Sequence, residues 1–225
     1  MNDIRDSILG SLRTTLAQRA SIETRKTMME NRLKNKPSGI IPKRGQLKAE
    51  ERIELFVKMA SDAQTVVTRV AKYTDIPKDV VTYLRAHNLP FSVCSGHDKR
   101  LAKAKWASEP NLEVEKRASD GGDLVGISHA TSAIAESGTL LLTSGKDNPT
   151  TINFLADHHI VILNAKDIKG DLESALGKLK KNADGSTEMP RAINLITGPS
   201  RSGDIEQKLL LGAHGPRALK IVIVG

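Results

Sequence analysis

Apolar residues recur with a helical spacing along the first part of the chain. Positions 4, 8, 12 and 16 are Ile or Leu, which lays one apolar stripe along a helix predicted over residues 2–34. Pro and Gly residues between positions 35 and 45 interrupt this pattern and predict a linker. The sequence therefore divides into an N-terminal helical arm, residues 1–36, and a main domain, residues 46–225.

Strand-like runs alternate with helical segments in the main domain. Uninterrupted Val, Ile and Leu strands alternating with helices favour an α/β fold, with a mainly parallel sheet flanked by helices. A Ser137-Gly138 connection between two apolar runs predicts a hairpin. Helices are predicted over residues 48–71, 77–88, 97–106, 150–157 and 171–181, and strands over 91–94, 112–115, 132–136, 139–143, 160–163, 192–197 and 219–224.

The positive charge gathers in the first fifty residues. The chain carries a net charge of +8, and residues 1–50 hold 11 Lys or Arg against 5 Asp or Glu. This segment is either a solvated helical arm or a docking element for an acidic protein or nucleic acid. It contains no aromatic residue on which bases could stack. Nucleic acid is therefore the less favoured partner.

Several classes of protein are disfavoured by what the chain contains. One cysteine, Cys94, cannot form an internal disulfide, nor can one chain with a single cysteine hold a Cys-ligated iron–sulfur cluster by itself. No apolar run approaches the roughly 20 residues that span a bilayer, and the acidic residues near Met1 argue against a secretory signal. No metal-ligand spacing of His, Cys or Asp occurs. We expect a cytoplasmic protein with no metal site and no membrane span.

Glu136 is the first candidate for chemistry. It sits at the lip of the predicted hairpin, beside small residues. A carboxylate there could act as a base, as a nucleophile or as a hydrogen-bond acceptor. The alternative is a turn acid that braces backbone N–H groups.

Residues 143–149 form a second candidate, Thr-Ser-Gly-Lys-Asp-Asn-Pro, between a strand and a helix. Exposed N–H groups at a helix start favour an anion, which Ser144, Lys146 and Asn148 could help to bind. Ordinary helix capping, with Asn148 as the cap and Pro149 in the first turn, explains the pattern equally well. The spacing is neither a P-loop nor a Rossmann fingerprint.

Two Gly- and Pro-rich motifs near the end of the chain, residues 198–206 and 212–217, are the strongest candidate. Both lie between the last two predicted strands, and sites in open α/β sheets form in crevices at strand ends. Arginine forks bind carboxylate or phosphate, and hydroxyl groups add donors. Alternatively, the arginines pair with nearby acids such as Asp204, Glu206 or Asp123. The predicted anion-binding residues are Ser200, Arg201, Asp204 and Arg217, with His214 as a loop histidine that either shuttles protons or is merely exposed.

These motifs resemble those of the LUD domain and of the lactate-utilisation protein C family. The resemblance rests on residues 133–139, on Asn148-Pro149, and on residues 198–206 and 211–217. It is specific over residues 120–225 and weaker over residues 1–119. It implies a fold like that of the NagB, RpiA and CoA-transferase enzymes.

The resemblance also implies a function. Family members take part in the oxidation of L-lactate to pyruvate, beside partner proteins that carry iron–sulfur clusters. We therefore expect a subunit that has no redox cofactor of its own, works with iron–sulfur lactate-utilisation subunits and binds a small carboxylate or phosphate. Two alternatives remain open: a stand-alone enzyme like the CoA-transferases or the folate cyclo-ligases, and a non-catalytic assembly subunit.

Overall fold

The computed structural model describes residues 2–17, 21–35, 39–177, 179, 189–202 and 210–225. It divides the chain into two units, residues 1–40 and residues 41–225. The first unit contains the helices α1 (Asn2–Ala17) and α2 (Ile22–Asn35), where the sequence predicted one continuous helix. Ser21 accounts for the second start, because its Oγ accepts a 3.1 Å hydrogen bond from the backbone N–H of Thr24, as a helix cap does. Four apolar side chains of α1 are exposed, those of Ile4, Ile8, Leu12 and Leu16.

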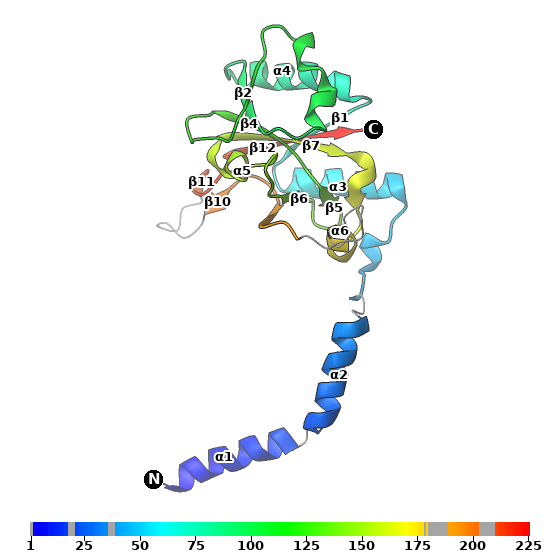
Figure 1. Cartoon of the computed structure of the whole chain (residues 1–225), viewed down its shortest axis with the longest axis vertical. Coiled ribbons are helices and arrows are strands. Elements are labelled where there is room, and N and C mark those ends of the chain that lie inside the picture. The colour runs from blue at the N-terminus through cyan, green and yellow to red at the C-terminus, as the bar shows by residue number, and fades with distance from the viewer. Residues whose placement is uncertain (1, 18–20, 36–38, 178, 180–188, 203–209) are drawn as a thin grey trace. The chain divides into compact units, whose positions relative to one another are not determined.

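A six-stranded parallel sheet organises the second unit (Figure 1). The strand order is β1-β12-β7-β4-β2-β3, and every pairing in it is parallel. The α/β prediction with a mainly parallel sheet is thus confirmed. The strands are β1 (Val66–Val70), β2 (Ser92–Ser95), β3 (Glu113–Lys116), β4 (Val125–His129), β7 (His158–Asn164) and β12 (Ala218–Val224).

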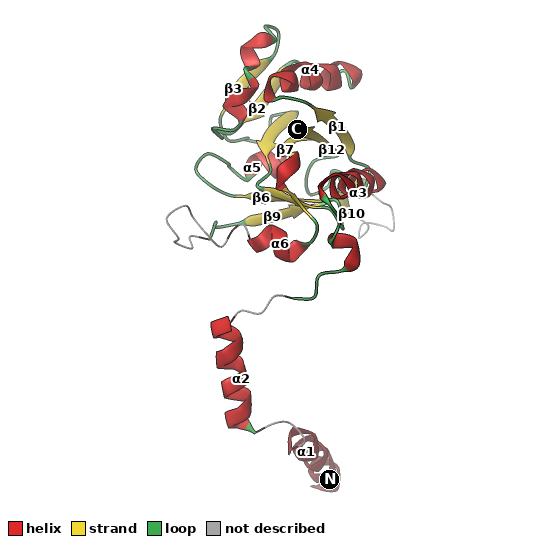
Figure 2. Cartoon of the chain, turned by 90° about the vertical axis from the view of Figure 1, so that its right-hand side faces the viewer, coloured by secondary structure: helices red, strands yellow, loops and turns green. Residues whose placement is uncertain are grey.

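A second, four-stranded sheet lies on one side of the first (Figure 2). Its order is β8-β5-β6-β9, with antiparallel pairing between β5 and β6 and between β6 and β9. The predicted hairpin is confirmed, although its connection is the four-residue turn 135–138. The strands are β5 (Ser132–Ile134), β6 (Thr139–Thr143), β8 (Ile168–Lys169) and β9 (Ile193–Ile196), and a two-stranded ribbon is formed by β10 (Arg201–Ser202) and β11 (Leu210–Leu211).

Helices cover both faces of the six-stranded sheet. The helix α4 (Ile76–Ala86) packs on one face, where its Val80 and Leu84 meet Ile160 and Ile162 of β7. On the other face lie α3 (Ala49–Asp62) and α5 (Thr151–Leu155), with α6 (Leu172–Gly177) beyond the second sheet (Figure 2). Alternate residues of β7 therefore enter two separate cores. Short 3₁₀ helices occupy 43–45, 73–75, 101–104, 106–108 and 165–167.

Two strands of the central sheet differ from the prediction. The helix predicted over residues 48–71 ends at Asp62, and β1 follows, paired with β12 in the register Val66↔Lys220. The β-branched residues of β1 favour a strand wherever a partner strand is available. The sequence also missed β4, because Gly126, Ser128 and His129 interrupt its apolar pattern although the whole strand is buried. Among the described helices, none is both long and apolar enough to cross a membrane.

Candidate functional site

The two C-terminal motifs come together in space. The backbone N–H of Ser200 donates to the carbonyl of Pro216 at 2.8 Å, and that of Gly212 donates to the carbonyl of Ser200 at 3.0 Å. The N–H of His214 points at Ser200 Oγ, 3.4 Å away. Segments that follow β9 and precede β12 are thus joined by backbone hydrogen bonds. The sequence predicted two candidate motifs between the last two strands, and the structure places these motifs side by side.

A hollow of about 450 Å³ opens where the motifs meet. It lies at the amino ends of two parallel strands, since His159 and Leu219 are each the second residue of β7 and β12. Its walls mix apolar and polar groups, as small-molecule sites do. The lining consists of residues 195–201 and 214–216, Ala63, Asn153, Phe154, His159 and Leu219.

The structure separates the two arginines. Arg201 lines the hollow, and its Nη2 donates a 3.0 Å hydrogen bond to the carbonyl of Ala63. Arg217 instead forms an ion pair with Asp157, at 3.2 Å, and is absent from the described lining. Of the predicted anion-binding set, Ser200, Arg201 and His214 share the hollow, while Arg217 pairs with an acid that the sequence reading did not name. Asp204 lies outside the described residues.

The buried end of the hollow holds His159, which the sequence reading did not select. Its imidazole is 1% exposed, its Nε2 lies 2.7 Å from Ser128 Oγ, and its Nδ1 has no hydrogen-bond partner among the described residues. Burial lowers the pKa of His159 to about 3, so the ring is neutral at physiological pH. His158 faces the opposite side of the sheet, where its Nδ1 lies 2.9 Å from the Tyr83 hydroxyl. The sequence signal that could have identified His159 is a histidine at the start of an otherwise largely apolar strand.

Glu136 lies in the β5–β6 turn, away from this lining. Its side chain is 14% exposed, and its Oε2 lies 3.8 Å from Arg44 Nε without a hydrogen-bond partner among the described residues. Its backbone N–H donates to the carbonyl of Gly170 at 3.1 Å. The turn also packs tightly on α3, because a Cβ at Gly138 would meet the backbone of Ala60 at 2.5 Å. The carboxylate is therefore held close to a cation in a packed turn.

Ser144 and Asn148 brace their own loop. Ser144 Oγ accepts a 2.8 Å hydrogen bond from the N–H of Ala192. Asn148 exchanges two backbone hydrogen bonds with Gly145, and the cap of α5 is Thr150, so Asn148 is not the helix cap that the sequence suggested. This loop packs against Gly96, where a Cβ would meet the carbonyl of Asp147 at 2.3 Å. Neither side chain lines the hollow described above.

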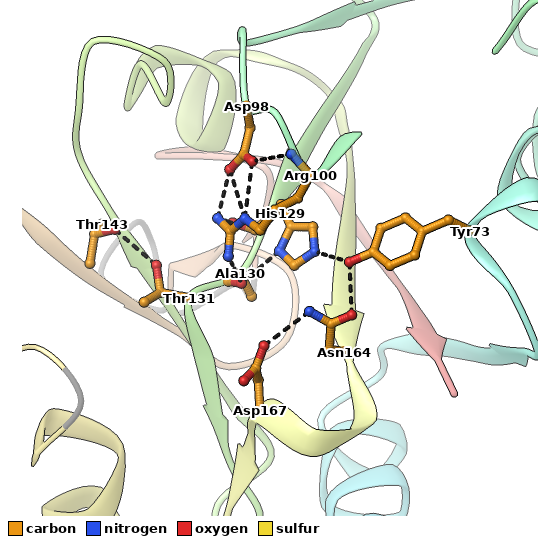
Figure 3. A network of polar contacts seen from close by, with 9 residues as sticks. All are labelled: Tyr73, Asp98, Arg100, His129, Ala130, Thr131, Thr143, Asn164 and Asp167. Carbon is orange, nitrogen blue, oxygen red and sulfur yellow. Dashed lines mark hydrogen bonds and ion pairs between the residues drawn. The ribbon is translucent and has the colours of Figure 1, made fainter. Parts of the chain in front are cut away.

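A polar network that the sequence did not reveal occupies the carboxyl ends of the parallel strands (Figure 3). The Tyr73 hydroxyl lies 2.7 Å from Nε2 of His129, at the end of β4, and 2.8 Å from Oδ1 of Asn164, at the end of β7. The amide of Asn164 donates to Asp167 at 3.0 Å. His129 Nδ1 lies 2.7 Å from the carbonyl of Ala130. Sequence positions far apart meet here only because the sheet is parallel.

Burial and nearby charges shift the pKa values of two residues in this network, His129 and Asp98. Burial, helped by the charge of Arg100, lowers the pKa of His129 to about 4. Burial acts to raise the pKa of Asp98, but hydrogen bonds and charge from Arg100 outweigh it and hold that pKa below its ordinary value. With His129 neutral and its Nδ1–H bound to Ala130, the single proton of the Tyr73 hydroxyl is shared between two acceptors. The network is thus a partly buried array of hydrogen bonds.

Comparison with known proteins assigns most of the chain to one family. The sequence profile of the LUD domain family matches residues 53–224. A lactate utilization protein C of Bacillus subtilis is 33% identical over 120 residues, which is 53% of this chain and 49% of that protein. A protein of the same name from Macrococcus caseolyticus is 35% identical over 114 residues, 51% of this chain and 47% of that protein. The matches thus span about half the length of these relatives.

A solved structure shares the fold. A DUF162 family protein from Deinococcus radiodurans superimposes with a TM-score of 0.61 over 80% of this chain and 99% of that chain. The two sequences are 19% identical, so this likeness concerns the fold alone.

Proposed function

Because the chain belongs to the LUD domain family, we propose that it takes part in L-lactate utilisation, as a subunit of a system that oxidises L-lactate to pyruvate. The names of its relatives support this role. We place the protein in the cytoplasm, in agreement with its single, buried cysteine.

Oxidation of lactate releases a pair of electrons, which need an acceptor. The chain has one cysteine, Cys94, and burial raises the pKa of its thiol to about 11, which disfavours the thiolate that binds metals. We therefore assign the redox centres to iron–sulfur partner proteins. The contribution of this chain is then to bind an anionic ligand and to assemble with those partners.

The observation that carries the ligand proposal is the meeting of the two motifs around the hollow. Ser200, Arg201 and His214 all line it, and the one side-chain hydrogen bond that Arg201 makes among the described residues uses one of its five donors. Charge-assisted hydrogen bonds contribute about 1.5–3 kcal/mol each. Two or three such bonds suffice to hold a small carboxylate or phosphate at the rim.

Calorimetry with L-lactate, pyruvate and inorganic phosphate tests the ligand proposal. Arg201→Ala should weaken the binding of whichever anion binds by about tenfold or more, because a charge-assisted bond is lost. Arg217→Ala is the matched control, since Arg217 pairs with Asp157 outside the lining, and it should have a smaller effect. Equal effects of the two substitutions, or no binding of any of the three anions, would refute this assignment.

Deletion of the gene in its host, followed by capture of the tagged protein from lactate-grown cells, tests the role. We expect loss of growth on L-lactate, normal growth on glucose, and co-purification of proteins that contain iron and acid-labile sulfide. Complementation with the Arg201→Ala variant should restore less growth than the Arg217→Ala variant. Normal growth on L-lactate without the gene, in a strain with no other lactate dehydrogenase, would contradict the proposal.

A further inference from the structure

The buried end of the hollow is neutral and incompletely hydrogen-bonded. His159 Nδ1 has no partner among the described residues, and a buried polar atom without a partner is costly. Asn153 of α5 also lines the hollow, is 5% exposed, and brings a carboxamide with both a donor and an acceptor. An uncharged group that hydrogen-bonds fits this end better than a carboxylate or phosphate would.

Backbone packing explains why these two side chains share the hollow. Gly126 of β4 is paired with His159 of β7 in the sheet register. Without a side chain at Gly126, α5 approaches closely, since a Cβ there would lie 3.0 Å from the carbonyl of Ile152. Asn153, the next residue, is thereby held beside the start of β7. The floor of the hollow is therefore fixed by regular structure rather than by a loop.

The walls of the hollow are largely apolar between its buried floor, at His159 and Asn153, and its exposed mouth, at Arg201 and His214. Phe154, Leu195, Pro199, Pro216 and Leu219 line them, and Phe154 is 42% exposed although it is aromatic. Aromatic and proline surfaces are flat and suit the face of a planar ring. The volume of about 450 Å³ is that of sites for drug-sized molecules, and a three-carbon acid would fill a small part of it.

The mouth is cationic, in contrast to the floor. Arg201 and His214 stand there with the hydroxyl of Ser200, and the N–H of His214 is directed at that hydroxyl. A ligand that matches the whole hollow has an uncharged hydrogen-bonding edge at one end, a planar body, and an anionic group at the other end.

We propose that the hollow binds a nucleoside monophosphate, with the base edge on His159 Nδ1 and the Asn153 amide, and the phosphate on Arg201, His214 and Ser200. The assignment rests on the proposed function for the anion at the mouth, and goes beyond it in assigning the floor and the ligand class. His159 and Asn153 are then the residues that select the base.

Calorimetry with inorganic phosphate and with the 5′-monophosphates of adenosine, guanosine, cytidine and uridine tests this proposal on the full chain. At least one nucleotide should bind more tightly than phosphate. His159→Leu and Asn153→Ala should each weaken that nucleotide by about fivefold to tenfold, and leave phosphate binding unchanged, because each removes hydrogen bonds to the base only. His158→Leu is the matched control, since His158 is the neighbouring residue but faces Tyr83.

A second readout avoids the risk that His159→Leu disturbs folding through the lost Ser128 contact. In wild-type protein labelled with ¹⁵N-histidine, the nucleotide should shift one ring Nδ1 resonance, which is absent from the His159→Leu spectrum. Binding of phosphate without tighter binding of any nucleotide would overturn this proposal and leave the anion site standing. Nucleotide binding that neither floor substitution weakens, or that leaves the His159 Nδ1 resonance unmoved, would also overturn it.

Discussion

Gly198 lies against the carbonyl oxygen of Ala63, so closely that a Cβ on Gly198 would come within 2.4 Å of that oxygen. Gly198 also has a φ of +72°, a conformation that side chains disfavour. The same carbonyl accepts the hydrogen bond of Arg201. The end of α3 thus positions both the first motif and the arginine at the mouth of the hollow.

Gly198→Ala should destabilise the protein by about 1–3 kcal/mol, because the new methyl group meets backbone and the left-handed φ becomes strained. Urea unfolding followed by circular dichroism measures the change. Gly145→Ala is the control, since a Cβ there meets nothing within 4 Å, and it should change the free energy of unfolding by less than about 0.5 kcal/mol. Equal costs at the two glycines would contradict the packing described.

Tyr73→Phe should cost about 2–3 kcal/mol, because it removes the hydroxyl that links His129 Nε2 and Asn164 Oδ1 and leaves both acceptors without that partner. Tyr83→Phe provides the comparison. Among the described residues its hydroxyl is hydrogen-bonded to His158 alone, so the loss of this one bond should cost about 1 kcal/mol. Denaturant unfolding of both variants at neutral pH compares them. A larger loss for Tyr83→Phe would argue against the network as a unit.

Acid should destabilise the fold between about pH 6.5 and pH 4. The folded pKa values of His129 and His159 are about 4 and about 3, below the ordinary value of 6.5. The unfolded chain therefore binds protons that the folded chain excludes, and stability present above pH 6.5 is lost as the pH falls, by at most about 3 kcal/mol for each histidine at pH 4.

Unfolding measured from pH 7.5 to pH 4 checks this dependence. His159→Leu should flatten the slope across that range, since it removes one of the three described histidines whose pKa is lowered, the other two being His129 and His158. Asp98, whose pKa is lowered, loses its stabilising contribution only as the pH falls below about 5, so the slope between pH 6.5 and pH 5 belongs to the histidines. An unchanged slope in His159→Leu would show that the imidazole is not excluded from protonation in the folded state.

Lys220 is a buried cation on the opposite face of the sheet from His159. Its Nζ lies 2.9 Å from Asp79 and 3.0 Å from the Thr68 hydroxyl. Asp79→Leu should lower the free energy of unfolding by about 3–5 kcal/mol, because it leaves the buried charge of Lys220 without its ion-pair partner. Adding Lys220→Met should recover most of that loss. A double-mutant cycle in denaturant measures the coupling, and additive losses would mean that the pair does not act as a unit.

The domain organisation predicts that residues 41–225 fold without the arm. This unit contains both packed sheets and all three apolar clusters of buried residues, and the family match begins only at residue 53. A protein that starts at Ile41 should keep the melting temperature of the full chain to within a few degrees. A large decrease would show that the arm stabilises the main domain.

Local sequence patterns were sufficient to predict those features that depend on residues close together in the chain. The alternation of apolar strands with helices predicted the α/β architecture, and the Gly- and Pro-rich motifs predicted the loops that meet at Ser200 and Pro216. Hydrophobic periodicity gave the wrong prediction at β1. It assigned the valines of this segment to a helix, whereas in the structure they form a strand that pairs with β12. It failed at β4 because the pattern is broken by Gly126, which is needed for close packing of α5.

Long-range packing decided the rest of the site. From sequence alone, Arg201 and Arg217 were equivalent, and the contact with Asp157 that separates them joins residues 60 positions apart. The sequence did not distinguish His159 from the adjacent His158. In the structure the two side chains lie on opposite faces of the sheet, His159 beside Ser128 and His158 beside Tyr83. The network of Tyr73, His129 and Asn164 has no sequence signature, because parallel strands bring their carboxyl ends together regardless of separation along the chain. The chain's composition and periodicity thus determined the elements and the motifs, while strand order and burial determined which side chains meet and which charges they carry.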